Sequence, residues 1–165
     1  MATLVALIAV LVMAVGVAAW FRGEANQLTS SPAATNDALV DKDTTAQVSA
    51  QISEAVKRVY SYDFARLADN ERAAKAVVTG PFVDTFQQQF AKIRQLAPPQ
   101  QAAVVASVPA IAVKDLEGDR AIVLVFIDQE AHQAGKDKPL LATGRLSITA
   151  QRVDGRWKIA DAESF

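Results

Sequence analysis

The pattern of apolar positions divides the chain after residue 37 into a helical half and a strand half. Between residues 38 and 100 apolar side chains recur every three or four positions, which is the spacing of a helix packed on one side. A first helix is predicted from about Ala38 to Tyr60 on the stripe Val48, Ile52, Val56 and Val59.

A second long helix is predicted from Pro81 to about Leu96, because proline is favoured in a first helical turn. Its apolar stripe comprises Phe82, Phe86, Phe90 and Ile93, and the pair Pro98-Pro99 is expected to close it. The intervening segment contains short helical pieces, whose starts Asp63 or Asn70 could cap.

Beyond Gln100 the pattern changes to the alternation that is typical of strands. Turns are expected at 117–120 and at Asp154-Gly155, a strong hairpin signal, with a longer hairpin loop near 132–141. The predicted fold class is therefore α+β. About three helices pack on a curved antiparallel sheet of about four strands, which gives a cone-shaped domain.

The strand within 118–130 is apolar on both sides, whereas a small antiparallel sheet usually leaves one side to water. One side carries Ile122, Leu124 and Phe126, and the other carries Ala121, Val123, Val125 and Ile127. Strand 102–114 shares this two-sided character, allowing for a bend near Pro109. Because the helices can cover only one face, we expect something else to cover part of the second.

The predicted interface consists of six apolar side chains, Val105, Ile111, Val113, Val123, Val125 and Ile127. Its polar rim would be Arg145, Ser147 and Thr149 on the neighbouring strand, as in many protein interfaces. The candidate occupants are a second copy, a subunit of a larger complex or a lipid. The alternative is that the C-terminal strand and the long loop of the same chain fold over this face.

The N-terminal segment predicts a membrane anchor. Residues 2–21 carry no charge, span roughly 30 Å as a helix and are followed by Arg22. A cleaved secretory signal is the alternative, although the apolar run is long for one. We therefore predict an anchor at 1–22, a flexible linker at 23–37, and an extracytoplasmic α+β domain at 38–165. The expected location is the cell membrane, crossed once.

Charge and composition exclude several classes of function. The chain has 17 Lys and Arg against 18 Asp and Glu, so no positive field attracts nucleic acid. It has no cysteine and one histidine, which excludes disulfides, thiol nucleophiles and a multi-histidine zinc site. We expect no metal and no cofactor.

Catalysis in a conical fold would require a general base and a hydrogen-bond donor in an enclosed site. The candidates are Tyr60, Tyr62, Asp63, Asp128 and His132. Each also has a structural explanation: the tyrosines pack at a helix end, Asp63 caps a helix, and Asp128 and His132 lie near solvent. No catalytic pair, nucleophile triad or phosphate loop is visible, so we predict a protein that is not an enzyme.

Four stretches together resemble the actinobacterial and mycobacterial Mce-associated membrane proteins, where Mce abbreviates mammalian cell entry. They are NDALVDKDTTAQVSAQISEAVKRVYSYDFARL, VVTGPFVDTFQQQFAKIRQLA, GDRAIVLVFIDQE and RVDGRWKIADAE, and they cover nearly all of the chain after the membrane segment. The resemblance implies a single-pass membrane protein whose extracytoplasmic domain resembles nuclear transport factor 2.

The same resemblance implies an accessory, stabilising subunit of an Mce-type lipid-import complex, with Mce subunits as partners. Two other functions stay open from the sequence. One is a pocket enzyme of the isomerase or cyclase type, and the other is an inner-membrane component of a secretion system with a similar anchor-plus-domain plan.

Overall fold

The computed structural model describes residues 36–39 and 41–165. The predicted anchor at 1–22 and nearly all of the predicted linker at 23–37 lie outside these residues. Asp37–Phe165 forms one compact unit. Within the described residues, no helix combines the length and apolar character that crossing a membrane requires.

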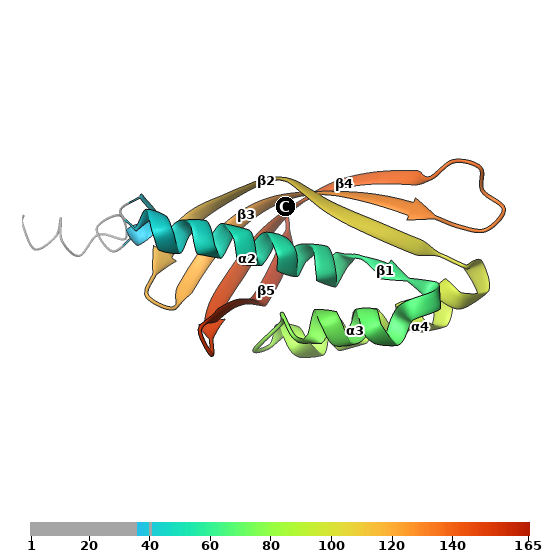
Figure 1. Ribbon diagram of the computed structural model, residues 1–165, viewed down its shortest axis with the longest axis horizontal. Helices are drawn as coiled ribbons and strands as arrows, with labels where there is room; N and C mark the ends of the chain where they lie inside the picture. Colours follow the sequence, from blue (N-terminus) through green and yellow to red (C-terminus); the bar gives the residue numbers. More distant parts are fainter. Residues whose placement is uncertain (1–35, 40) are drawn as a thin grey trace, which may run out of the picture. The chain divides into compact units, whose positions relative to one another are not determined.

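The described chain folds as α-helices on one open antiparallel sheet, which confirms the predicted fold class (Figure 1). The helical elements are the 3-10 turns η1 (Asp37–Leu39) and η2 (Phe64–Arg66) and the helices α2 (Lys42–Tyr60), α3 (Leu67–Lys75) and α4 (Phe82–Gln100). The strands, in their order across the sheet, are β1 (Tyr62–Asp63), β2 (Ala103–Glu117), β3 (Arg120–His132), β4 (Leu140–Val153) and β5 (Arg156–Ser164). The four long strands are those predicted, and the short β1 is the addition.

Helix α2 forms the predicted first stripe, but it begins a few residues later than expected. Asp41 caps it by accepting a hydrogen bond of 2.9 Å from the Thr44 N–H, which satisfies one of the free donors of the first turn. Hydrogen bonds from Thr44 also lower the pKa of the Asp41 carboxyl. All four predicted stripe residues are buried: Val48, Ile52, Val56 and Val59.

Helix α4 contradicts the prediction that Pro98-Pro99 closes it, because it continues to Gln100. A proline removes an N–H donor, but its φ of about −65° suits a helix. The helix ends instead at Gln101, whose φ is 46°. Two hydrogen bonds close the end: Gln101 N–H donates to the Pro98 carbonyl at 3.1 Å and Ala102 N–H to the Ala97 carbonyl at 2.9 Å.

Three hairpin connections join the four long strands where the sequence predicts them. Asp154-Gly155 is a two-residue connection with φ of 53° and 74°, and two left-handed residues match the twist of the flanking strands. Gly118, with φ of 54°, lies in the turn between β2 and β3. Residues 133–139 form the longer loop between β3 and β4.

A bulge in β2 reverses which side chains face the helices. The register passes from Ser107 opposite Asp128 to Ala110 opposite Phe126, so Val108 and Pro109 together oppose one residue of β3. The expected bend near Pro109 is therefore present. It shifts the alternation by one residue, which places Val105 on one face of the sheet and the Ile111 and Val113 side chains on the other.

The core lies between the helices and one face of the sheet. Helix α2 packs along β2, β3 and β5, while α4 packs against β5 (Figure 1). Strand side chains that complete the core include Ala121, Val123, Val125, Ile127, Leu146, Ile148, Trp157 and Ile159, and all are buried. The helices and this face of the sheet therefore bury each other's apolar side chains.

Replacing Phe90, which is buried and lies 5.4 Å from Phe86 between ring centroids, tests this packing. We expect Phe90→Ala to lower the free energy of unfolding by about 3–5 kcal/mol, through lost burial and the cavity left behind. The control Leu96→Ala, on the same helix but 59% exposed, should change it by no more than about 0.5 kcal/mol. Urea denaturation of residues 36–165 measures both changes. Equally small losses of unfolding free energy in the two variants would contradict this description of the core.

Candidate functional site

The face of the sheet away from the helices carries a row of apolar side chains. We call these residues the open face: Val105, Ala110 and Ala112 of β2 and Ile122, Leu124 and Phe126 of β3. Phe126 lies opposite Ala110 and Leu124 lies opposite Ala112, so their side chains are cross-strand neighbours. Val105 is 60% exposed and Phe126 is 49% exposed, and the leucine and isoleucine are half-buried. No described element covers them.

Polar side chains border the open face on the β4 side. Arg145 lies opposite Phe126, Ser147 opposite Leu124 and Thr149 opposite Ile122. The next strand adds acidic groups, with Glu163 opposite Ser147 and Asp161 opposite Thr149. The patch is therefore apolar in the middle and polar along this border.

The predicted interface was assigned to the wrong face. Val123, Val125 and Ile127 are buried in the core, and Ile111 and Val113 pack against it. The helices cover this face because β4 extends it with Leu146 and Ile148, whereas the other side of β4 is polar. Among the six predicted interface residues, Val105 alone lies on the open face.

The alternative expectation, that the C-terminal strand folds over the second face, is also not observed. Strand β5 pairs edge to edge with β4 from Leu146 to Val153, as a further strand of the same sheet. The final residue continues this edge, where the Phe165 N–H donates to the Arg145 carbonyl at 3.3 Å. The Arg145 guanidinium lies 5.5 Å from the centre of the Phe165 ring.

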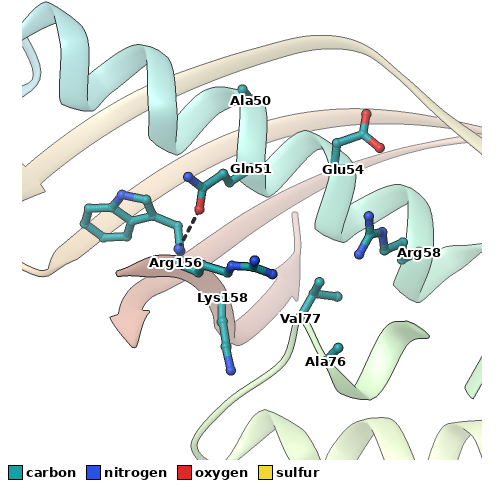
Figure 2. A pocket seen from close by; sticks show the side chains of 9 residues that line it. Ala50, Gln51, Glu54, Arg58, Ala76, Val77, Arg156 and Lys158 are labelled. Carbon is teal, nitrogen blue, oxygen red and sulfur yellow. Dashed lines mark hydrogen bonds between the residues drawn. The ribbon is translucent and has the colours of Figure 1, made fainter. Parts of the chain in front are cut away.

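A cleft of about 360 Å³ opens on the helix side, between α2, the segment after α3, and β5 (Figure 2). Arg58 and Arg156 point toward it, and neither makes an ion pair among the described residues. Glu54 instead forms an ion pair with Lys57, which lowers the pKa of the Glu54 carboxyl. The cleft therefore has a positive rim and lacks a free general base. Sequence periodicity could not reveal it, because its residues come from three distant segments.

One side chain of α2 that lines this cleft forms a hydrogen bond with β5. The Gln51 carbonyl oxygen accepts a hydrogen bond of 2.8 Å from the Trp157 backbone N–H, and so ties α2 to β5 (Figure 2). The indole nitrogen of Trp157 is buried without a hydrogen-bond partner among the described residues.

The predicted catalytic candidates differ in their surroundings. Tyr60 packs against the core at the end of α2, and burial raises the pKa of both Tyr60 and Tyr62. Asp128 is exposed and directed to the uncovered side of the sheet. His132 is also exposed, with its Nε2 2.9 Å from a carboxylate oxygen of Glu130.

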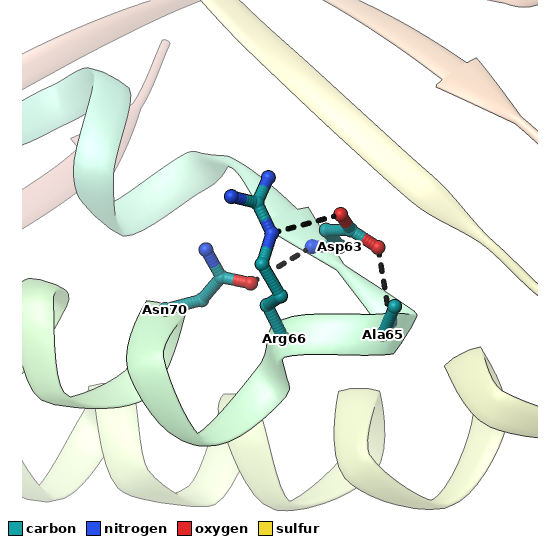
Figure 3. Close-up of polar contacts among 4 residues, drawn as sticks. All are labelled: Asp63, Ala65, Arg66 and Asn70. Atoms are coloured by element: carbon teal, nitrogen blue, oxygen red, sulfur yellow. Dashed lines mark hydrogen bonds and ion pairs between the residues drawn. The ribbon is translucent and has the colours of Figure 1, made fainter.

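Asp63 acts as a helix cap, as predicted (Figure 3). Its carboxylate accepts a hydrogen bond of 2.9 Å from the Ala65 N–H and lies 3.2 Å from the Arg66 guanidinium. The Asp63 N–H in turn donates to the Asn70 side chain at 3.0 Å. β2 lies between Asp63 and His132, so their Cα atoms are two strand spacings apart, roughly 10 Å.

Among the described residues, no group of three or more His, Asp and Glu side chains is placed to hold a metal ion. Two features of the described residues are the candidates for binding a partner or ligand, the open face and the basic cleft. The open face is suited to an apolar partner, and the cleft to an anion.

No known family model matches the chain. It is similar to two Mycobacterium tuberculosis proteins. Outer membrane protein Rv1973 is 34% identical over 92 residues, which cover 55% of this chain and 57% of that protein. Uncharacterized protein Rv1362c is 30% identical over 113 residues, covering 67% of this chain and 50% of that protein. The chain thus spans about half the length of the curated relatives it matches.

The fold is shared with VirB8 and with a VirB8 homologue of a type IV secretion system. CagV, a VirB8 homologue from Helicobacter pylori, matches with a TM-score of 0.61 at 15% identity, over 72% of this chain and 96% of CagV. VirB8 from Agrobacterium tumefaciens matches with a TM-score of 0.59 at 14% identity, over 73% of this chain and 90% of VirB8. The domain therefore has the VirB8-like form of the nuclear transport factor 2 fold.

The structural role of Asp63 can be tested with two substitutions. We expect Asp63→Ala to lower the free energy of unfolding by about 1 kcal/mol, because the Ala65 N–H loses its acceptor. Asp63→Asn keeps an acceptor and loses only the exposed contact with Arg66, so its loss should be less than half as large. Urea denaturation measures both. Equal losses for the two variants would show that the charge, rather than the cap, matters.

Proposed function

We propose that this protein is a non-catalytic, membrane-associated interaction domain that serves as an accessory subunit of an Mce-type lipid-import complex. The observation that carries the proposal is the open face, an apolar surface that no described element of the chain covers. The similarity to a mycobacterial outer membrane protein and the resemblance to Mce-associated proteins support the membrane setting and the partner.

The composition of the open face supports binding to protein. Large exposed apolar patches on a folded domain mark interaction sites, especially when polar residues surround them. Protein interfaces usually have such a polar rim around an apolar centre. Phe126 provides an aromatic side chain, a type that is enriched in protein interfaces. Its exposed fraction of 49% leaves ring surface for a partner to bury.

The proposed location is the extracytoplasmic side of the cell membrane, with residues 2–21 as a single anchor and 23–37 as the linker. The hydrocarbon-like composition of residues 2–21 supports the anchor. The periplasmic domain of DotI, with a TM-score of 0.61 at 15% identity, shows that this fold is used outside the cytoplasm in another protein.

A second candidate is a component of a secretion system in the inner membrane. The VirB8-like fold favours it, because CagV, which shares this fold, is a VirB8 homologue of a type IV secretion system. Fold is nevertheless shared widely among proteins of different function, so it weighs less than the surface that the chain presents.

Charged substitutions on the open face test the proposed function. We expect Phe126→Glu and Val105→Glu, in the full chain purified from its own cells in mild detergent, to abolish co-purification of Mce subunits. A buried carboxylate without a partner would oppose binding at this surface. The control Leu96→Glu places the same charge on an equally exposed apolar position of α4, and should retain the partners.

Circular dichroism and thermal unfolding would establish that all three variants fold like the wild type. Retention of every partner by both open-face variants would exclude this surface as the interface. Recovery of a secretion ATPase, with no Mce subunits, would support the second candidate instead.

A further inference from the structure

Strand β4 is longer than its neighbour β5, which leaves part of its edge unpaired. β5 pairs with β4 only from Leu146 onward, and Phe165 follows with its bond to the Arg145 carbonyl. The five residues Leu140–Gly144 pair with β3 alone. This segment, which we call the free edge, belongs to the hairpin that extends beyond the end of α2 in Figure 1.

The direction of the backbone groups along the free edge follows from Arg145. Its carbonyl points to the β5 side, and alternate residues of a strand point the same way. The N–H and C=O groups of Leu141 and Thr143 are therefore directed outward, and no strand of the described chain pairs with them. Such a row of unpaired groups is a template for another strand.

The side chains of the free edge provide none of the usual protection against pairing. Its sequence, Leu-Leu-Ala-Thr-Gly, contains no charge. Leu140 is 72% exposed and Leu141 71% exposed, which makes them the most exposed large apolar side chains among the described residues. Because they are consecutive, they point to opposite faces, and a strand added at this edge would contact both.

We propose that the free edge pairs antiparallel with the free edge of a second copy of this chain, around a two-fold axis at Ala142. In this register Leu141 of each copy lies opposite Thr143 of the other, and these pairs exchange about four N–H···O=C hydrogen bonds. Leu140 lies opposite Gly144 of the other copy, and Ala142 lies opposite itself.

The length and composition of the segment favour a second copy over an unrelated strand. The available edge ends at Phe165 on one side and is preceded by Pro139 on the other, so a register centred on Ala142 uses all five residues. In a shifted register, the incoming strand would either collide with Phe165 or leave some of the five residues unpaired. In the register centred on Ala142, Leu140 lies opposite Gly144 of the other copy, which has no side chain. No charged residue lies opposite one of the same charge.

The pairing has a consequence for the open face. The two-fold axis of an antiparallel strand pair is perpendicular to the sheet, so both open faces would lie on the same side of one continuous sheet. A partner could then contact two copies at once. The pairing does not depend on the proposed function, because it concerns the edge of the sheet rather than its face.

A five-residue strand pair is small. It buries less than the roughly 800 Å² per partner of a standard interface, so we expect weak association that covalent capture can reveal. The sequence contains no cysteine, which makes single-cysteine variants unambiguous. Residues opposite each other in a non-hydrogen-bonded pair have Cα atoms about 4.5 Å apart, within the range that a disulfide spans.

We expect Ala142→Cys in the full chain, in detergent under mild oxidation, to form a disulfide-linked dimer at least tenfold faster than a control cysteine does. The control is Ala73→Cys, at an alanine of α3 that is also exposed. Cross-linking at the same rate in both variants would overturn the proposal.

Charge-swapped variants distinguish a second copy from any other occupant. Ala142→Lys and Ala142→Glu place like charges opposite each other at the two-fold axis, so each variant alone should sediment as a monomer at concentrations where the wild type dimerises. An equimolar mixture should recover the dimer. Loss of association in both variants without recovery on mixing, or dimers in each variant alone, would overturn pairing through this edge. Unchanged thermal unfolding would show that both variants are folded.

Discussion

The rest of the structure depends on one constraint: the apolar surface of the helices buries one face of the sheet and leaves the other uncovered. This covered face contains Val123 and Val125. It packs against the apolar stripe of α2, from Val48 to Val59, and against the three phenylalanines of α4. The other face keeps apolar side chains, among them Phe126, that the described chain leaves in contact with water. A surface of this kind is stabilised when a partner buries it, which links the fold to the proposed role in an assembly.

Much of this fold follows from local patterns in the sequence. The helix stripes, the hairpin at Asp154-Gly155 and the cap at Asp63 are each decided by interactions within a few residues, so the sequence predicts them correctly. The end of α4 depends on a left-handed residue at Gln101, which has no strong sequence signal. For that reason the prediction that the two prolines end the helix was wrong.

Assignment of the two faces required information that alternation alone does not contain. The bulge at Val108 and Pro109 shifts the pattern by one residue, so Val105 and Ile111 cannot share a face. The decisive signal was available in β4: Leu146 and Ile148 alternate with polar residues, and pairing through the β3–β4 hairpin places them beside Val125 and Val123. The basic cleft and the free edge had no such signal, because they depend on where distant segments end.

The central claim is that one face of the sheet is covered by the chain itself while the other is left for a partner. Because the 165-residue chain contains no cysteine, the rate of thiol labelling of single-cysteine variants measures this directly. Phe126→Cys should react with a maleimide at nearly the rate of an unfolded chain, and Val125→Cys, one residue away, at least a hundredfold more slowly. Equal rates, or slower labelling at position 126 in the isolated protein, would contradict the account.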